Sequence, residues 1–286
     1  MNTVLRPIRP ADARITGYLA FEAFKSSAEA HCFPLDFPSP EAGAGFAAAW
    51  IGHPEIFGVA AEVEGRFVGS NFLTEMDPVR GVGPITVAPG LHACGIGRRL
   101  MEAVIERGKG APVRLVQDAF NTVSLSLYAS MGFDAREPLA LMRGTLKGSE
   151  RAGTVVRAMT EEDLGEAEAL CVRVHKYPRT GELRDALRGL TPYVALREGR
   201  ITAYVTSVAN WHLNHGVAET EADLQDVIVG ASRLAGEPFS LLLPIRQAAL
   251  HRWALQQGMR MVKPMTLMTM GDYQEPRGAW YPSVLY

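Results

Sequence analysis

The second half of this chain repeats the order of patterns found in the first half. Residues 4–12 (VLRPIRPAD) and 155–163 (VVRAMTEED) each read as a short strand that runs into an acidic helix start. Apolar periodicity then predicts a helix over 13–24 in the first half and over 164–174 in the second. A repeat of this size constrains the fold strongly, because it predicts one chain topology used twice.

The later elements follow the same order. Each half contains a strand pair that turns at a glycine, Gly65 in the first half and Gly199 in the second. The apolar segment 239–244 stands where 113–119 stands in the first half, and both read as strands. We therefore expect a tandem duplication whose seam is the glycine- and serine-containing linker at 147–153.

These patterns predict an α/β (α+β) chain of two tandem domains, residues 1–147 and 154–286. Strands and helices occur together in each half, so each domain should contain a mixed central β-sheet flanked by helices. The length of 286 residues and the 47% of hydrophobic residues are enough for two cores.

A glycine-containing loop in the first half indicates an anion site. A β-prone segment at 83–88 leads into a loop with Gly95 and Gly97, and residues 98–106 then predict a helix. The start of a helix presents unpaired backbone N–H groups and the positive end of the helix dipole, a combination that binds phosphate. We expect that a Cβ at either glycine would stand between these amides and the anion.

Two other kinds of phosphate loop do not fit the residues. A P-loop needs Lys followed by Ser or Thr after its last glycine, and Arg98 and Arg99 stand there. A dinucleotide fingerprint needs a glycine spacing different from that of Gly90, Gly95 and Gly97. On this motif alone, a glycine-rich turn without a ligand remains the alternative.

A second block of residues follows the loop. Residues 113–119 predict a strand, and 121–131 predict a helix that ends at Gly132, where a glycine cap is expected. With both blocks the chain resembles the GNAT superfamily of acetyl-CoA-dependent N-acyltransferases. The residues that carry the resemblance are Val87, Pro89, His92, Gly95 and Gly97 in the first motif, and Asn121, Ser124, Leu127, Tyr128, Gly132 and Phe133 in the second. His92 is a departure, because Gln or Arg is commoner at that position of the family.

The resemblance implies two tandem GNAT-like domains and a site for acetyl-CoA as cosubstrate, without a metal. It assigns the pyrophosphate cradle to His92, Ala93, Cys94, Gly95, Ile96, Gly97 and Arg98. Val87 would end the strand that exposes backbone groups to the pantetheine amides, and Asn121 and Ser124 would contact the coenzyme arm. Tyr128 would protonate the departing CoA thiolate; packing on a helix face is its alternative role.

The activity that the resemblance implies is transfer of an acetyl group from acetyl-CoA to a primary amine of a small molecule, by direct attack within a ternary complex. An ammonium group has a pKa of about 10, so a base or a water chain must remove its proton. Asp118, near the end of its strand, is a candidate for the base or for an anchor of the ammonium, with helix capping as the alternative. Glu75 and Asp77 compete for the same role. A regulatory or scaffolding protein that binds acetyl-CoA without turnover is the alternative function.

Candidates for the acceptor site lie in the first half and at the C-terminus. The proline-broken, aromatic loop at 28–40 stands where the family binds its acceptor, which makes His31, Phe33, Asp36 and Phe37 candidates; a plain connection is the alternative. The tail at 271–286 ends in large apolar side chains, and burying each contributes about 1.5–3 kcal/mol, so we expect the tail to dock. Either it seals the seam between the halves, or Tyr286 and its free α-carboxylate reach the acceptor cleft.

The second half lacks the features of the coenzyme site. Acidic residues stand where the glycine loop should be, and they would repel a pyrophosphate; they are Glu219, Glu221, Asp223 and Asp226. Ala254 takes the position of the tyrosine. We therefore expect one coenzyme site per chain. The resemblance implies that the second domain packs on the first and helps to shape the acceptor pocket.

Composition excludes several other classes of protein. A net charge of −2 with interspersed signs does not match a nucleic-acid-binding chain. The apolar runs are too short for a membrane span, and the N-terminus leaves no room for a signal peptide. The scattered cysteines, Cys32, Cys94 and Cys171, suit a reducing cytoplasm, and the two histidines within 211–215 lack a third metal ligand. We expect a monomer or homodimer whose partner is a small-molecule amine.

Overall fold

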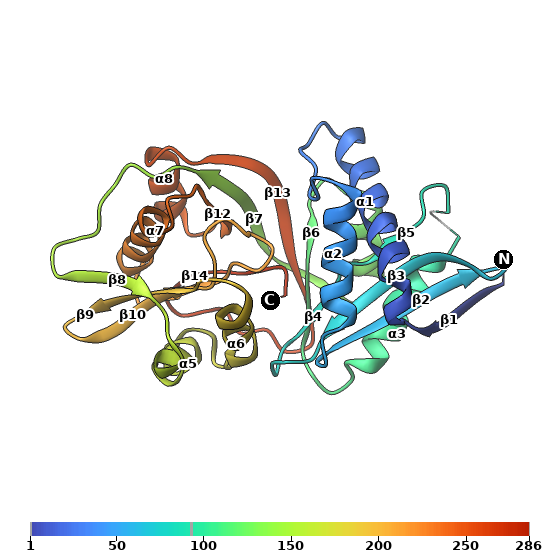
Figure 1. Ribbon diagram of the computed structural model, residues 1–286, viewed down its shortest axis with the longest axis horizontal. Helices are drawn as coiled ribbons and strands as arrows, with labels where there is room; N and C mark the ends of the chain where they lie inside the picture. The colour runs from blue at the N-terminus through green and yellow to red at the C-terminus, as the bar shows by residue number, and fades with distance from the viewer. Residues whose placement is uncertain (1, 92–93, 286) are drawn as a thin grey trace.

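The computed structural model describes residues 2–91 and 94–285, and it folds them into two β-sheets with helices on their faces (Figure 1). The elements of the first half are β1 (Thr3–Pro7), α1 (Ala13–Ala30), α2 (Pro40–Ile51), β2 (Ile56–Val63), β3 (Arg66–Thr74), β4 (Arg80–Val82), β5 (Thr86–Val87), α3 (Ile96–Arg107), β6 (Val113–Asp118), α4 (Thr122–Ser130) and β7 (Asp134–Gly144).

The second half runs through a similar order of elements. They are β8 (Thr154–Ala158), α5 (Leu164–His175), α6 (Thr180–Gly189), β9 (Tyr193–Arg197), β10 (Arg200–Val205), β11 (Gly216–Ala218), α7 (Glu221–Ala235), β12 (Phe239–Pro244), α8 (Ala248–Gln256), β13 (Arg260–Met270) and β14 (Ala279–Tyr281). A short 3-10 helix precedes the first helix of each half, at Pro10–Asp12 and at Glu161–Asp163. The α+β class and the repeated topology are confirmed.

Several boundaries differ from the sequence prediction. The first helix runs on to Ala30, well past the predicted end at residue 24. The segment 83–88 pairs only at Thr86–Val87, as β5. Helix α3 begins at Ile96, so Gly97 lies inside its first turn. The N–H groups of a first turn have no partner within the helix, which makes glycine tolerable there and hides the true start from a periodicity argument.

The nine-stranded sheet crosses the seam between the two halves. Its order is β1-β2-β3-β4-β6-β13-β7-β12, with β5 paired to β3, whereas β14-β11-β10-β9-β8 form the second sheet. Strand β13 of the second half lies between β6 and β7 of the first half, antiparallel to both. Strand β7 in turn lies between β13 and β12, which both come from the second half. The two halves therefore exchange one strand each.

This exchange was not visible in the sequence. Alternating side chains identify a strand and its faces, but they do not say which strand lies beside it.

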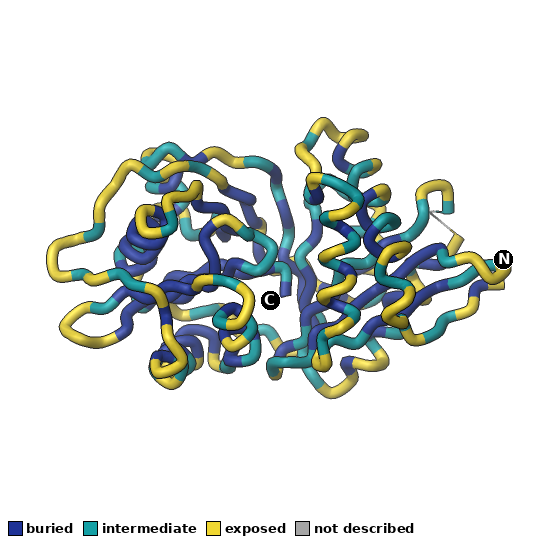
Figure 2. The backbone as a smooth tube through the Cα atoms, viewed as in Figure 1, coloured by how far each residue is buried: buried dark blue, intermediate teal, exposed yellow. Residues whose placement is uncertain are grey.

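Pairing of β4 with β6 is parallel and the other pairs of this sheet are antiparallel, so the sheet is mixed as predicted. Buried segments continue through the shared strands from one half into the other (Figure 2). One side of the shared strands packs on the core of the second half, through Leu139 and Leu141 of β7 and Met265 and Leu267 of β13.

The C-terminal tail docks, as its apolar composition predicts. Strand β14 pairs with β11 and buries Trp280 and Tyr281, whose exposed fractions are 4% and 1%. Farther on, Leu285 packs against Trp50 of the first half. A Cβ at Gly81 would lie 2.5 Å from the carbonyl oxygen of Leu285, so glycine permits the tail to approach β4 closely. The tail thus joins the second sheet to the first half.

No helix in the described part of the chain has the length and apolar character that crossing a membrane requires.

The strand exchange predicts that neither half is a complete folding unit. Residues 1–147 produced alone would leave β6 and β7 without β13 between them, exposing two rows of unpaired backbone groups. We expect this fragment to aggregate or to lack a cooperative urea transition by circular dichroism. Coexpression with residues 154–286 should restore a soluble complex with cooperative unfolding. A monodisperse 1–147 fragment that unfolds cooperatively would show that β13 is not required.

Candidate functional site

Two cavities meet beside the carboxyl end of β6. We name the smaller one, of about 140 Å³, the seam cavity, because both halves line it. We name the larger one, of about 520 Å³, the loop cavity, because residues of the first half line it, including Gly95, Gly97 and Arg98. The side chains common to both cavities are Phe24, Ile85, Asp118, Asn121, Ser124 and Tyr128. Whatever occupies the two cavities meets at these residues.

The loop cavity opens where the first half's sheet divides. Strand β4 pairs with β6 at Arg80 and Gly81, whereas β5 turns away and pairs with β3. Val87 of β5 lies in the wall of the cavity on one side, and α4 borders it on the other. The amino end of α3 lies at the same cavity through Gly95 and Gly97. An anion in this cavity would therefore meet free N–H groups and the positive end of a helix dipole.

The two loop glycines have different reasons to be glycine. Gly95 caps α3 with φ of +79°, a left-handed conformation that side chains with a Cβ rarely adopt. Gly97 is helical, and a Cβ there would make ordinary van der Waals contact with Leu127 at 3.5 Å. The protein itself therefore accepts a side chain at 97. A need for glycine at 97 must come from whatever fills the cavity.

Most of the predicted coenzyme-binding residues line the loop cavity. They are Val87, Gly95, Gly97, Arg98, Asn121, Ser124 and Tyr128. Ile96 is instead 1% exposed and packs in the core, and Cys94 is an exposed free thiol; the described lining includes neither side chain. Only their backbone can serve a cradle. His92 and Ala93 lie outside the described residues.

Tyr128 of α4 stands at the junction of the two cavities. Its side chain is only 5% exposed, and burial raises its pKa to about 12, with the nearby Asp118 charge acting in the same direction. Hydrogen bonding with Ser124 opposes the rise. The phenol therefore keeps its proton throughout the neutral pH range. It can donate that proton to a group that becomes basic at the junction.

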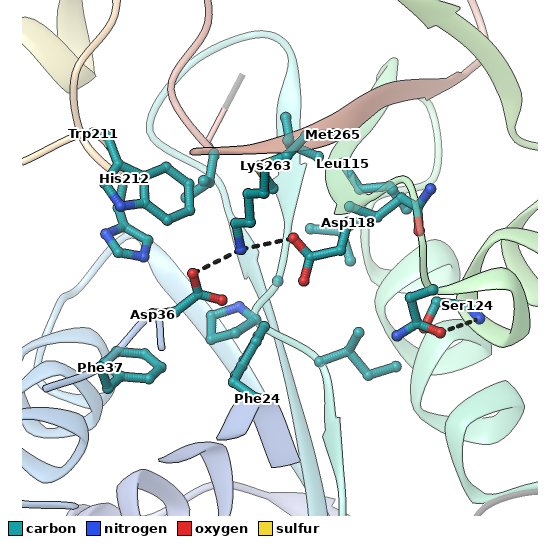
Figure 3. Close-up of a pocket in the computed structure, with 18 of the residues that line it drawn as sticks. Phe24, Asp36, Phe37, Leu115, Asp118, Ser124, Trp211, His212, Lys263 and Met265 are labelled. Atoms are coloured by element: carbon teal, nitrogen blue, oxygen red, sulfur yellow. Dashed lines mark hydrogen bonds and ion pairs between the residues drawn. The ribbon is translucent and has the colours of Figure 1, made fainter. Parts of the chain in front are cut away.

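Asp118, Lys263 and Asp36 form an ion triad in the lining of the seam cavity (Figure 3). Lys263 Nζ lies 2.7 Å from Asp118 Oδ1 and 2.7 Å from Asp36 Oδ1. All three side chains are at most 10% exposed. Met265 of β13 pairs with Asp118 of β6, so Lys263 extends just beyond the end of β6. The strand exchange thus delivers a cation from the second half between two carboxylates of the first half.

Asp118 has the properties of a base. Burial raises the pKa of its carboxyl group, Lys263 lowers it, and the second carboxylate of Asp36 raises it again. The helix-capping alternative does not apply, because Asn121 caps α4 by accepting a hydrogen bond from Ser124 N at 3.1 Å. The side chain of Asp118 turns to Lys263 instead. A carboxylate with a raised pKa accepts protons more readily than an exposed one.

Rings form much of the remaining wall of the seam cavity. They belong to Phe24, Phe37, Phe46, Trp211 and His212. His212 stacks on Trp211 with ring centroids 3.7 Å apart, and Phe37 lies 6.1 Å from His212. Burial lowers the pKa of His212 to about 4, so the imidazole is neutral at physiological pH. The wall is therefore apolar apart from the ion triad and a few amides and hydroxyls.

The structure separates the predicted acceptor residues into two groups. Asp36 and Phe37 line the seam cavity. Among the described lining residues of the two cavities neither His31 nor Phe33 appears; both lie against Phe120, with ring centroids 4.9 and 4.4 Å away. Their part of the loop is a surface cluster. Tyr286 lies outside the described residues.

The two alternative acids have other partners. Glu75 forms a bidentate ion pair with Arg107 at 2.8 and 2.9 Å. Asp77 accepts hydrogen bonds from the backbone of Gly181 and Glu182 at the start of α6. Neither acid is among the described lining residues of the cavities. Asp118 is the acid of the three that lines them.

Sequence reasoning missed the site residues supplied by the second half and several of the first, among them Phe24, Phe46 and a buried amide. Lys263, Trp211, His212 and Val284 line the seam cavity, as does Gln117. The sequence signal for Lys263 is that it is the one lysine in the mostly apolar strand segment 261–270. A lysine is rarely buried in such a strand unless its charge is paired. Gln117 is 6% exposed, and neither polar atom of its amide has a hydrogen-bond partner among the described residues.

Comparisons with known proteins find similarity to acetyltransferases. The model of the acetyltransferase (GNAT) family matches residues 24–133. A comparison with curated proteins found no match. A protein from Pyrococcus horikoshii that is named as an acetyltransferase shares 15% identity over 99% of this chain and 94% of that chain, with a TM-score of 0.72.

Two further solved structures cover nearly the whole chain. A GCN5-related N-acetyltransferase from Sphaerobacter thermophilus has 17% identity and a TM-score of 0.61, covering 99% of this chain and 98% of that chain. A tandem GNAT protein from the clavulanic acid biosynthesis pathway has 13% identity and a TM-score of 0.59, covering 96% and 100%. At these identities the likeness shows a shared fold, which is that of tandem GNAT proteins.

The ion triad predicts a pH-dependent loss of stability in Lys263→Met. Removing the cation leaves two buried carboxylates uncompensated, which costs about 3–5 kcal/mol at pH 8. The pKa of Asp118 is already raised, so its carboxylate reduces stability as the pH rises through that pKa; without Lys263 the pKa rises further and the unfavourable window extends upward. Below this window the carboxyl group is protonated and the loss should be smaller.

Urea unfolding at pH 5 and pH 8 measures this difference. The matched control is Lys109→Met, because Lys109 is 77% exposed and should change stability little at either pH. Equal losses for Lys263→Met at the two pH values would show that the triad's charges do not govern its stability.

Proposed function

We propose that the protein transfers an acetyl group from acetyl-CoA to a primary amine of a small molecule, by direct attack within a ternary complex. The match of the acetyltransferase (GNAT) family model to residues 24–133 supports this proposal. The observation that carries the proposal is the meeting of two cavities at Tyr128 and Asp118. One cavity has a helix amino end for a pyrophosphate, and the other has a carboxylate for an amine. Both substrates would then be present together at one proton donor and one proton acceptor.

The loop cavity suits acetyl-CoA, the cosubstrate of the GNAT family. It is the larger of the two, and the free amides at the start of α3 suit the pyrophosphate. Arg98 lies in its wall and donates to Ser130 Oγ at 2.7 Å, so its guanidinium group adds positive charge at the surface end. When bound there, acetyl-CoA supplies an acetyl group activated as a thioester.

Asp118 would accept the proton of the acceptor ammonium. An amine is nucleophilic only after it loses that proton, and few such groups are unprotonated near pH 7. Asp118 lines both cavities, so it lies where the amine must approach the acetyl group. Lys263 would hold this carboxylate in place through their 2.7 Å contact. We propose Lys263 as a positioning residue for the base.

Tyr128 would donate a proton to the sulfur as the thiolate leaves. Its raised pKa keeps the phenol protonated until that moment. Val87, at the carboxyl end of β5, would present its backbone N–H to the developing negative charge on the acetyl oxygen.

These roles need no metal ligand. The three free cysteines are consistent with a reducing compartment, and we propose a cytoplasmic enzyme that is a monomer or homodimer.

We propose that the second half holds no second coenzyme site. Its counterpart of α3 is α7, which has two acidic side chains in its first turn, Glu221 and Asp223. The hydroxyl group of the cap residue Thr220 accepts a hydrogen bond from Asp223 N. Asp223 and Asp226 there pair with Arg151 of the linker. The counterpart of Tyr128 is Ala254, which is 2% exposed within α8. The second half would instead serve the seam cavity.

The loop assignment predicts the effect of Gly97→Glu. A glutamate in the first turn of α3 favours the helix, because it interacts with the positive end of the dipole, yet it repels a pyrophosphate. We expect wild-type protein to bind one acetyl-CoA per chain by calorimetry and the variant to bind none, with an unchanged melting temperature. Gly45→Glu, on an exposed turn of α2, is the matched control and should bind normally. Binding of Gly97→Glu within about threefold of wild type would remove the cradle assignment.

Replacement of Tyr128 by Phe tests the proton donor. The change keeps the packing and removes only the hydroxyl, so kcat should fall by roughly 10²–10⁴-fold while acetyl-CoA affinity stays within about threefold. Free thiol release over a panel of amines measures the rate. Tyr18→Phe, outside both cavities, is the matched control. Unchanged turnover would make Tyr128 a packing residue, and acetyl-CoA binding without thiol release from any amine would favour a regulatory binding protein.

A further inference from the structure

We infer that the seam cavity takes a small primary amine with a single positive charge and an apolar body about the size of one ring. This inference rests on the proposed acetyl transfer and names the acceptor class for the same site. Three observations carry it: the charge balance of the ion triad, the ring wall, and the small volume of the cavity between the two halves.

The charge balance leaves room for one cation. Asp36 and Asp118 bring two negative charges, and Lys263 brings one positive charge. His212 is neutral at physiological pH, so the described charged groups of the lining sum to −1. One ammonium brings the sum to zero, which is what a buried site needs. A second ammonium group on the acceptor would be buried without a partner. A carboxylate on the acceptor would face the two aspartates, and the one cation of the site, Lys263, already pairs with both of them.

The wall beyond the triad fits an apolar body. Phe24, Phe37, Phe46, Trp211 and Met265 line it, and the stacked pair of Trp211 and His212 presents flat faces. Flat and aliphatic groups gain from burial against such rings. A hydroxyl-rich body such as an aminoglycoside would lose hydrogen bonds to water that these rings cannot replace. The buried amide of Gln117 offers a neutral polar contact for a single substituent.

Both halves line the cavity, and its volume limits the size of the acceptor. The loop before α2 supplies part of the lining, and three residues of the second half supply another part: Trp211, Lys263 and Val284. Val284 N donates a hydrogen bond to the carbonyl oxygen of His212 at 2.9 Å, so the tail holds the loop that carries Trp211 and His212 in place. A small amine fits a cavity of about 140 Å³, whereas a peptide needs an open groove.

Two matched pairs of amines test the acceptor class. Phenethylamine and phenylalanine differ by one carboxylate, and pentylamine and cadaverine differ by a second ammonium. We expect kcat/KM for the first member of each pair to exceed that of the second by about tenfold or more, corresponding to about 1.4 kcal/mol. Spermidine, kanamycin and a short peptide with a free amino terminus should be poorer acceptors than phenethylamine. A preference for any of these three, or for the zwitterion or the diamine, overturns the inference.

A tryptophan variant tests the ring wall. Trp211→Leu should raise KM for phenethylamine by about tenfold, corresponding to about 1.4 kcal/mol, and should change KM for pentylamine much less, because a leucine still contacts an aliphatic chain. The matched control is Trp253→Leu in α8, which lies outside both cavities and should leave both KM values unchanged. Equal effects of Trp211→Leu on the two amines would remove the ring-stacking argument.

Direct binding separates the acceptor class from the proposed reaction. Phenethylamine and cadaverine are titrated calorimetrically onto the full chain saturated with CoA, a measurement that needs no turnover. Tighter binding of phenethylamine without thiol release supports the acceptor class and overturns acetyl transfer. Acetylation of a polycation or a peptide, with no binding of phenethylamine, supports acetyl transfer and overturns the acceptor class.

Discussion

Pairing of β13 with β6 is the interaction on which the rest of this molecule depends. The ladder aligns Met265 with Asp118 and so places Lys263 just past the end of β6, beside two carboxylates. The same strand pairs with β7 on its other edge, which in turn pairs with β12. Since every backbone group of a central strand needs a partner, the two halves cannot separate without leaving unpaired ladders in both. The seam is therefore part of the sheet and not a contact between finished domains.

The ion triad links this architecture to chemistry. Two buried carboxylates near each other would be costly, and the ammonium of Lys263 offsets that cost without cancelling it. The remaining negative charge is the property that a site for an ammonium needs. Burial, the largest influence on Asp118, raises the pKa of its carboxyl group and makes the carboxylate a better proton acceptor. Stability and the proposed catalysis thus draw on the same three side chains, and a substitution at Lys263 should affect both.

The features that we propose for coenzyme binding occur in one copy of the duplicated topology. In the first half, α3 begins on a left-handed glycine at an open cavity, and α4 carries Tyr128. In the second half, α7 begins on Thr220 with acidic residues that pair with Arg151, and α8 carries Ala254 in a packed core. The second copy supplies two rings of the wall, Trp211 and His212, together with the triad lysine and Val284 of the tail. Its contribution is structural support and acceptor recognition in the proposed function.

The sequence by itself determined the features that depend on neighbouring residues in the chain. The repeated order of elements, the helix start at the glycine loop and the place of Tyr128 before Gly132 all follow from local backbone geometry and short spacing. Tertiary structure alone decided which side chains share the site. It selected Asp36 and not His31 from one loop, paired Asp118 with a lysine instead of a helix end, and brought Lys263 across the seam. The reason is that backbone hydrogen bonds are the same for every strand, so side-chain pattern specifies the faces of β13 but not its neighbours.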